Sequence, residues 1–299
     1  MPPTKKLSVL GKDDDGRRFL TGTFDEVNSA APHPHPVPSF YSTREHRRFA
    51  EFADTVRTHR YIGLCWGPPG IGKTLSARHY AGVDTWEQWQ YDIADTVGPV
   101  PPRVLEVRTA FYTPTVAATI KQIDQGLPRA CQAISYAIDY DELGLVDPYV
   151  HDASRSPGRT ELLIIDEADR LKSTGLEQVR DYYDRHHMGV ILIGMPGIEK
   201  RLARYPQLYS RIGFAHEYRP LGPDELTAVL TTRLPAQHTD HDPIAHATAL
   251  ATIARITAGN FRLLDRLATQ IERIQTINDL HTLTPELVDA AREALLIGH

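Results

Sequence analysis

The residues of this chain best suited to carry out chemistry form the run Gly67-Pro68-Pro69-Gly70-Ile71-Gly72-Lys73-Thr74. This run matches the phosphate-binding pattern G-x-x-x-x-G-K-[ST], known as the P-loop. Its glycines let backbone N–H groups turn inward around phosphates, and the start of the following helix adds partial positive charge. We expect Lys73 to reach the β- and γ-phosphates and Thr74 to bind Mg²⁺, with Leu75 completing the contact set. The run therefore predicts a site for a nucleoside triphosphate.

A second chemical element follows the apolar run Leu162–Ile165, which ends in the adjacent carboxylates Asp166 and Glu167. In a P-loop fold, a parallel strand of this kind delivers its last residues to the sheet edge where the nucleotide lies. Asp166 is suited to bind Mg²⁺ directly or through water. Glu167 is suited to orient and deprotonate an attacking water molecule. We therefore predict a hydrolytic site that uses both carboxylates.

Arginines near the end of the core are candidates for neutralising negative charge on a transferring phosphoryl group. Arg211 is our first choice because it lies just before the last predicted strand, at the edge of the core, and Arg204 is the second. Arg262 lies in the first turn of a helix that Asn260 can cap, which places a cation where the helix dipole disfavours it. A γ-phosphate close to that turn would explain Arg262.

The elements that must position these residues alternate between apolar strands and helices. Continuous apolar runs predict strands at 61–66, 104–107, 162–165, 189–194 and 214–218. Helices are expected from Thr43 onward, where Phe49, Phe52, Ala53 and Val56 recur at helical spacing, at 74–80 and 177–186, and around 130–138. A further helix is expected to open at Thr113, its cap, with Val116, Ile120 and Ile123 on its apolar face. Residues 84–102 are expected to be irregular. Unbroken apolar strands between helices are typical of a parallel sheet that is covered on both faces. The predicted class is an α/β fold with a five-stranded parallel sheet.

The chain divides into three predicted parts. Residues 1–44 are polar and rich in proline and histidine, which favours an extended arm whose histidines are solvated. Residues 45–220 form the α/β core. Residues 221–299 contain only helical patterns, and the last helix is opened by Thr284 followed by Pro285.

Composition narrows the class of protein further. The 299 residues are 41% hydrophobic and 24% charged, which is ordinary for a globular protein, and the formal net charge of −5 argues against a generally basic nucleic-acid binder. No apolar run approaches the roughly 20 residues that a membrane span needs. The first residues lack the apolar core of a signal peptide. Cys65 and Cys131 fall in predicted elements and are expected to be buried thiols in a reducing cytoplasm.

Taken together, several boxes resemble those of AAA+ ATPases: G-P-P-G-I-G-K-T, L-L-I-I-D-E-A-D-R-L, S-R-I-G and G-N-F-R. Within that superfamily, the segment from Gly194 through Arg211 is similar to transposition regulators of the MuB/TnsC/TniB type. The similarity covers roughly residues 45–297. The resemblance implies an AAA+ core followed by a small helical lid, with ATP and Mg²⁺ as cofactors.

Further expectations follow from this resemblance. ATP would lie between subunits, and the protein would form a ring or filament around duplex DNA and recruit a DDE-type transposase, with a TniQ-like targeting protein as a further partner. Arg211 would then be the finger supplied to a neighbouring subunit, and Arg262 the lid arginine called sensor 2. Many AAA+ proteins also carry a polar residue at the end of the fourth strand. This chain has Ile193-Gly194-Met195 there, which predicts weak or partner-stimulated hydrolysis.

The resemblance places DNA contacts on the loop after the second strand and near the helix that follows Asp166 and Glu167. The candidates are Thr113, Lys121, Arg155, Arg159 and Lys172. Other function classes stay open on the sequence alone. They are an AAA+ ATPase that acts on a protein partner in secretion or signalling, a replication initiator or helicase loader, and, more distantly, a metabolic nucleotide kinase.

Overall fold

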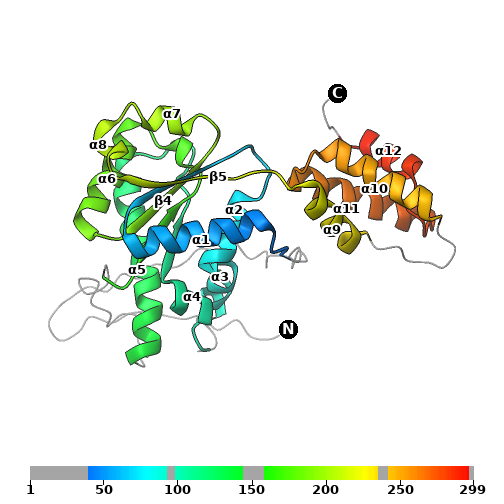
Figure 1. The fold of residues 1–299 in the computed structure, drawn as a ribbon. Helices are drawn as coiled ribbons and strands as arrows, with labels where there is room; N and C mark the ends of the chain where they lie inside the picture. The colour runs from blue at the N-terminus through cyan, green and yellow to red at the C-terminus, as the bar shows by residue number, and fades with distance from the viewer. Residues whose placement is uncertain (1–39, 93–97, 144–157, 235–241, 296–299) are drawn as a thin grey trace. The chain divides into compact units, whose positions relative to one another are not determined.

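The computed structural model describes residues 40–92, 98–143, 158–234 and 242–295. Its centre is a five-stranded sheet in the order β2-β3-β4-β1-β5, and every neighbouring pair is parallel (Figure 1). The strands are β1 (Ile62–Trp66), β2 (Thr109–Tyr112), β3 (Leu162–Ile165), β4 (Gly189–Gly194) and β5 (Ile212–Glu217). The predicted α/β class with a five-stranded parallel sheet is confirmed. Because the strands are parallel, all their carboxyl ends meet at one edge.

Both faces of this sheet are covered by helices, as continuous apolar strands predict. Every residue of β3 and β4 is buried. On one face, Leu162, Ile164, Ile191 and Ile193 pack with α1 (Arg44–His59) and α2 (Lys73–Ala81). The intervening residues of the same strands face the opposite side, where they pack mainly with α5 (Ile120–Leu143) and α6 (Ser173–His186). Cys65 and Cys131 are buried and free, as expected.

Helix α1 lies unusually close to the sheet, and glycines make that approach possible. A Cβ atom at Gly189 would lie 2.7 Å from the backbone oxygen of Val56, and one at Gly63 would lie 2.5 Å from the Val56 Cγ2 atom. Phe49, Phe52, Ala53 and Val56, which set the helical pattern, are all buried. Thr43 caps the helix by accepting a hydrogen bond from the His46 N–H at 3.1 Å.

The prediction of a strand at 104–107 is wrong. Residues Pro102–Val107 form α4, and the strand begins only at Thr109. Val104 and Val107 are buried while Glu106 is exposed, so their spacing of three is that of one helical face. The left-handed backbone of Arg108 ends the helix and redirects the chain into β2.

Two further expectations between β1 and β3 are also wrong. The stretch expected to be irregular contains α3 (Val83–Asp92), in which Trp86 and Trp89 are buried and stacked at 5.1 Å. The helix expected to open at Thr113 begins instead at Ile120, and Val116 is 80% exposed. The helix expected separately at 130–138 is part of this same helix α5.

The true start of α5 has a reciprocal cap. The Thr119 N–H donates to Gln122 Oε1 at 2.8 Å, and the Gln122 N–H donates to Thr119 Oγ1 at 3.3 Å. This arrangement is a capping box, in which two N–H groups left over at a helix start find side-chain acceptors. Thr119, rather than Thr113, is therefore the residue that caps this helix.

Short helices join the last strands, and longer ones follow. The short elements are η2 (Ala168–Arg170), α7 (Ile198–Leu202) and α8 (Pro206–Tyr209), and the later helices are α9 (Pro223–Arg233), α10 (Pro243–Thr257), α11 (Phe261–Asn278) and α12 (Pro285–Glu293). Helices α9–α12 share a hydrophobic cluster of their own, and Asn260 and Thr284 cap α11 and α12 as predicted. The domain boundaries at residues 44 and 220 stay predictions. None of the helices in the described ranges is long and apolar enough to cross a membrane.

The close approach of α1 gives a stability prediction. Gly189→Ala should lower the free energy of unfolding by roughly 1–3 kcal/mol, because the added methyl group meets a backbone oxygen that cannot rotate away. Urea denaturation followed by circular dichroism would measure the change. Gly98→Ala is the matched control, since a Cβ atom there meets nothing within 4 Å. Equal stability of the two variants would contradict the packing argument.

Candidate active site

The P-loop joins the end of β1 to the start of α2, at the carboxyl edge of the sheet. Gly70 and Gly72 have positive φ angles of 79° and 107°, a backbone region that side chains disfavour. Gly67 has a different constraint: a Cβ atom there would lie 2.3 Å from the Tyr218 carbonyl oxygen. Leu75 is 49% exposed in the first turn of α2. The loop thus has the strand–turn–helix setting that the motif requires.

Lys73 points its ammonium group into this loop. The side chain is buried, and Nζ donates to the carbonyl oxygens of Gly67 at 2.5 Å and Pro68 at 2.7 Å. Burial lowers the pKa of Lys73, while the nearby Asp166 carboxylate opposes that shift. A cation held inside a loop of backbone amides is suited to bind a polyphosphate.

Thr74 and Asp166 meet although they come from different parts of the chain. Thr74 Oγ1 donates to Asp166 Oδ2 at 2.8 Å, and the Glu167 N–H donates to Asp166 Oδ1 at 2.9 Å. Burial raises the pKa of Asp166, and the hydrogen bonds from Thr74 and Glu167 oppose the shift. A hydroxyl and a carboxylate are hard oxygen donors of the kind that Mg²⁺ prefers. The pair therefore fits the expected metal-binding role.

Glu167 stands at the same edge in a left-handed backbone conformation, with φ of 53°. Its side chain is 51% exposed and forms an ion pair with Arg170 at 2.9 Å. Arg170 also donates to the Pro114 carbonyl oxygen, at 2.9 Å, in the segment that follows β2. Sequence reasoning missed Arg170. Arg170 lies three residues after Glu167, a spacing that could have indicated an ion pair between the two side chains.

Asp169 is a second residue that sequence reasoning missed. Its Oδ2 accepts a hydrogen bond from the Met195 N–H at 2.6 Å, directly after β4. A Cβ atom at Gly194 would lie 2.6 Å from the same oxygen, so a glycine is needed for this contact. The end of β4 lacks a polar side chain of its own, but Asp169 brings a carboxylate there from η2. Arg201 fixes η2 by donating to the carbonyl oxygens of Asp169 and Leu171.

The start of α11 contacts the P-loop. Asn260 Nδ2 donates to the Pro69 carbonyl oxygen at 2.9 Å, and the Arg262 N–H donates to the Gly70 carbonyl oxygen at 2.9 Å. The Arg262 side chain is exposed in the first turn of α11. The structure therefore brings Arg262 to the P-loop, and its contact with a γ-phosphate stays a prediction.

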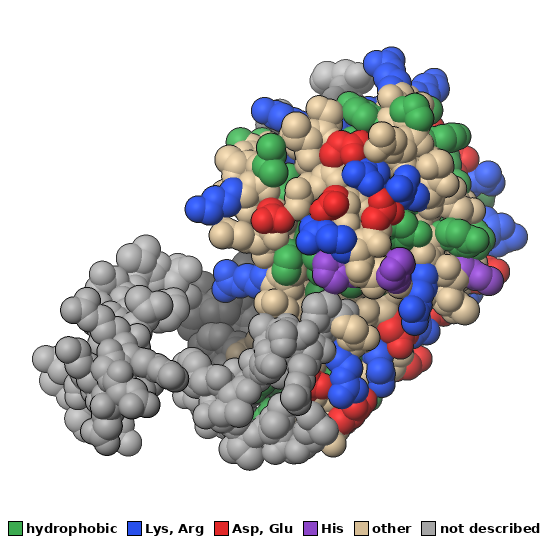
Figure 2. All heavy atoms as spheres, turned by 90° about the vertical axis from the view of Figure 1, so that its left-hand side faces the viewer, with side chains coloured by type: hydrophobic (Ala, Val, Ile, Leu, Met, Phe, Trp, Pro, Cys, Tyr) green, Lys and Arg blue, Asp and Glu red, His purple; other side chains and the backbone are tan. Residues whose placement is uncertain are grey.

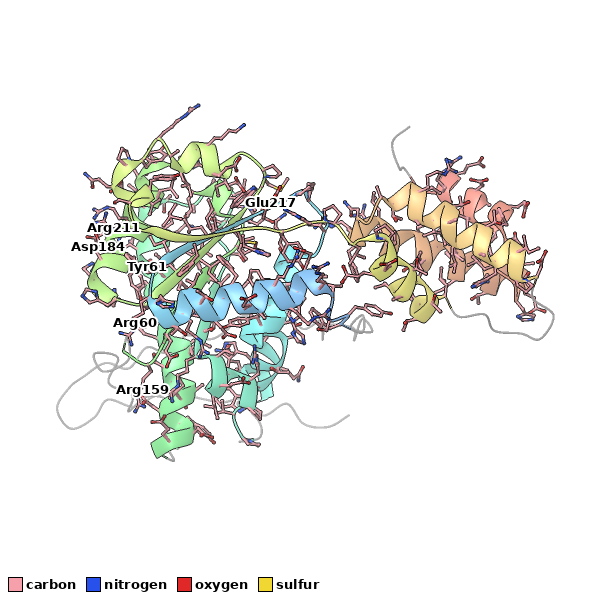
Figure 3. The ribbon with its side chains drawn as sticks, in the orientation of Figure 1. Arg60, Tyr61, Arg159, Asp184, Arg211 and Glu217 are labelled. Atoms are coloured by element: carbon pink, nitrogen blue, oxygen red, sulfur yellow. The ribbon has the colours of Figure 1, made fainter. Side chains whose placement is uncertain are left out.

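Arg211 does not belong to the site of its own chain. Its carbonyl oxygen accepts from the Ile62 N–H, so it lies at the amino ends of β1 and β5, whereas Glu217 lies beside Trp66 at the P-loop end. Arg211 and Glu217 stand at opposite ends of β5 (Figure 3). At about 3.3 Å per residue, this strand separates Arg211 from the P-loop edge by roughly 20 Å. Arg204, the second choice, is exposed after α7.

The candidates for DNA contact do not form one surface. Thr113 follows β2, Lys172 caps α6 and Lys121 lies in the first turn of α5, and all three are exposed at the carboxyl edge. Arg159 precedes β3 at the other edge and is paired with Asp139 at 2.9 Å and with Glu142. Arg155 lies outside the described residues.

Comparison with known proteins agrees with this site. A family profile described as an AAA domain matches residues 56–202, a range that includes the P-loop and both carboxylates. A protein of Staphylococcus aureus described as a potential ATP-binding protein is 41% identical over 273 residues, covering 87% of this chain and 97% of that protein.

Solved structures show the same fold. The RuvB Holliday junction branch migration motor of Thermotoga maritima has a TM-score of 0.52 and 16% identity, covering 85% of this chain and 69% of its own. The ORC2 protein of Aeropyrum pernix has a TM-score of 0.51 and 15% identity, covering 87% of this chain and 70% of its own. At such identities the likeness concerns the fold alone. From the domain match and the 41% identical ATP-binding relative, the chain belongs to the AAA family of ATP-binding ATPases.

Proposed function

We propose that this ATPase is a transposition regulator that assembles on duplex DNA in its ATP-bound form. The observation that carries the proposal is the position of Arg211 at the sheet edge opposite its own P-loop. An arginine placed there lies too far from its own P-loop to act on that nucleotide, so any nucleotide that it serves is held by another copy. ATP would then control assembly because it lies at the boundary between copies.

Within one site, the residues divide the work of hydrolysis. Bound ATP with Mg²⁺ supplies the phosphoanhydride bond and a cation that neutralises charge on the phosphate oxygens. Lys73 and the loop N–H groups would hold the phosphates, and Thr74 and Asp166 would hold the cation. Glu167 orients the attacking water and accepts its proton once its carboxylate leaves Arg170. Because Glu167 begins in an ion pair, we propose that basal hydrolysis is weak and rises with a partner.

The DNA and transposition parts of the proposal are supported by residues outside the nucleotide site. The segment from Gly194 to Arg211 resembles transposition regulators, and Lys121 and Lys172 expose cations on adjacent helices α5 and α6. The Gln178 side chain donates to Asp124 at 2.6 Å across these two helices, which ties them together. Repetition of such a pair in an assembly would multiply weak phosphate contacts. A DDE-type transposase and a TniQ-like protein are the proposed partners, in the cytoplasm.

The roles of Lys73 and Glu167 can be separated. Lys73→Ala should abolish ATP binding, because it removes the cation from the loop. Glu167→Gln should keep ATP binding and lower kcat by about 10²–10⁴-fold, the range expected when a general base is lost. Fluorescent-nucleotide titration and phosphate release would measure the two quantities. Full hydrolysis by Glu167→Gln would remove Glu167 from the role of base.

A mixing experiment tests whether the site is shared. Arg211→Ala and Glu167→Gln should each hydrolyse ATP slowly alone, because the first lacks the arginine finger and the second lacks the general base. Mixed in equal amounts with DNA, they should recover part of the wild-type ATPase rate, because Arg211 of the Glu167→Gln variant completes the intact site of the Arg211→Ala variant, and both variants still bind ATP and can assemble. A mixture that stays as inactive as its components would show that Arg211 does not act between copies.

DNA binding is tested by reversing charge at two positions. Lys121→Glu with Lys172→Glu should weaken ATP-dependent binding to duplex DNA at least tenfold and flatten its salt dependence. Each cation that no longer neutralises a phosphate leaves that phosphate's counterions bound, so fewer counterions are released on binding. Fluorescence anisotropy would give the affinities, and electron microscopy would reveal rings or filaments. Arg255→Glu with Arg273→Glu is the matched control, since both arginines are exposed on the later helices α10 and α11. Equal binding by both double variants would exclude the proposed surface.

A further inference from the structure

Arg211 is held by acceptors of its own chain through all three guanidinium nitrogens. Nε donates to Asp184 Oδ1 at 2.6 Å, and Nη2 donates to Asp184 Oδ2 at 2.8 Å. Nη1 donates to the Gln207 carbonyl oxygen. The two parallel bonds to one carboxylate form the fork geometry that makes arginine pairs strong and directional.

Asp184 belongs to a short chain of charges along the last turns of α6. Its Oδ2 also accepts from Arg180 Nη1 at 2.7 Å, and Arg180 Nε donates to Glu177 Oε2 at 2.8 Å. Hydrogen bonding to Arg211 lowers the pKa of Asp184, which keeps the carboxylate charged. Asp184 is therefore a fixed anion that competes for the guanidinium with any other anion.

The pair stands at the surface, where a second molecule can reach it. The side chains of Arg211 and Asp184 are 30% and 31% exposed, and Figure 3 shows them facing each other beside Tyr61 at the amino end of the sheet. On the face that includes this region, basic and acidic side chains alternate rather than separate into zones (Figure 2). Arg211 is thus neither buried beyond reach nor free to point at a phosphate.

We infer that Asp184 is a latch on Arg211: it retains the arginine within its own chain and thereby limits hydrolysis at the ATP site of the neighbouring copy. This inference rests on the proposed shared site. To present the same pair of N–H groups, on Nε and Nη2, to a neighbour's phosphate, the guanidinium must leave Asp184. The fork that orients Arg211 so well in the free chain is therefore the interaction that assembly has to break. Asp184 acts through Arg211 and touches no nucleotide.

The test uses mixtures in which each variant has one task. A donor carries Glu167→Gln, which keeps Arg211 and ATP binding, and an acceptor carries Arg211→Ala and keeps its P-loop and Glu167. Adding Asp184→Asn to the donor should raise the kcat of the mixture on duplex DNA by roughly tenfold, the order expected when one charge-assisted bond no longer has to break. Adding it to the acceptor should change nothing, because the acceptor has no Arg211 to release.

The matched control is Asp181→Asn in the donor, on the same helix. Asp181 pairs with Arg185 at 2.7 Å and makes no contact with Arg211, so its loss should leave the rate unchanged. Light scattering would verify equal assembly, and thermal melting equal folding. If Asp184→Asn unfolds the donor, Asp184→Glu replaces it, and this longer side chain should give a smaller rise.

The possible failures are distinct. Suppose that the unmodified mixture recovers activity, but that Asp184→Asn in the donor leaves the rate unchanged or lowers it. This result would overturn the latch and leave the shared site intact. The same conclusion would follow from an equal rise when the substitution is in the acceptor. If the unmodified donor and acceptor recover no activity at all, the shared site itself fails, and the latch fails with it.

Discussion

The hydrogen bond between Thr74 and Asp166 connects the segments that follow β1 and β3, two strands that are not neighbours in the sheet. β1 precedes Thr74, β3 precedes Asp166, and β4 lies between them. The contact requires the carboxyl ends of these strands to lie at one edge of the sheet, and parallel pairing supplies that condition. The folded sheet and the nucleotide site are therefore specified together.

Asp169 shows how the space above β4 is used. Its carboxylate lies over Gly194 and accepts from the Met195 N–H, so a polar group stands where the strand itself offers none. Arg201 holds the backbone of η2 from the other side. The loops after β3 and β4 are thus bonded to each other, and Arg170 adds a bond to the loop after β2. Such links favour movement of these loops as a group rather than singly.

Much of this arrangement was predictable because it depends on local pattern. The P-loop, the carboxylates after β3, and the caps at Asn260 and Thr284 depend on residues close in sequence, and the structure contains each of them. The wrong assignments arose where a local pattern fits two structures. Val104–Val107 is apolar enough for a strand, and its burial at a spacing of three decides for a helix. Both Thr113 and Thr119 can cap a helix, and only Thr119 has Gln122 to complete a reciprocal pair. Asp169 and Asp184 could not be placed from sequence, because their roles depend on partners on other elements of the sheet.

Gly67, the first glycine of the P-loop, is constrained by packing against Tyr218. Tyr218 contacts the P-loop region twice: its carbonyl oxygen leaves no room for a side chain at Gly67, and its hydroxyl bonds Ser76 in α2 at 2.7 Å. Tyr218 directly follows β5, where the chain leaves the sheet toward the later helices. The first glycine of the motif is thus a packing residue at the exit of the core. If every residue of the loop were substituted in turn, substitutions at Gly67 would disrupt folding where β5 leads into the later helices. Substitutions at Lys73 would instead weaken the binding of phosphate.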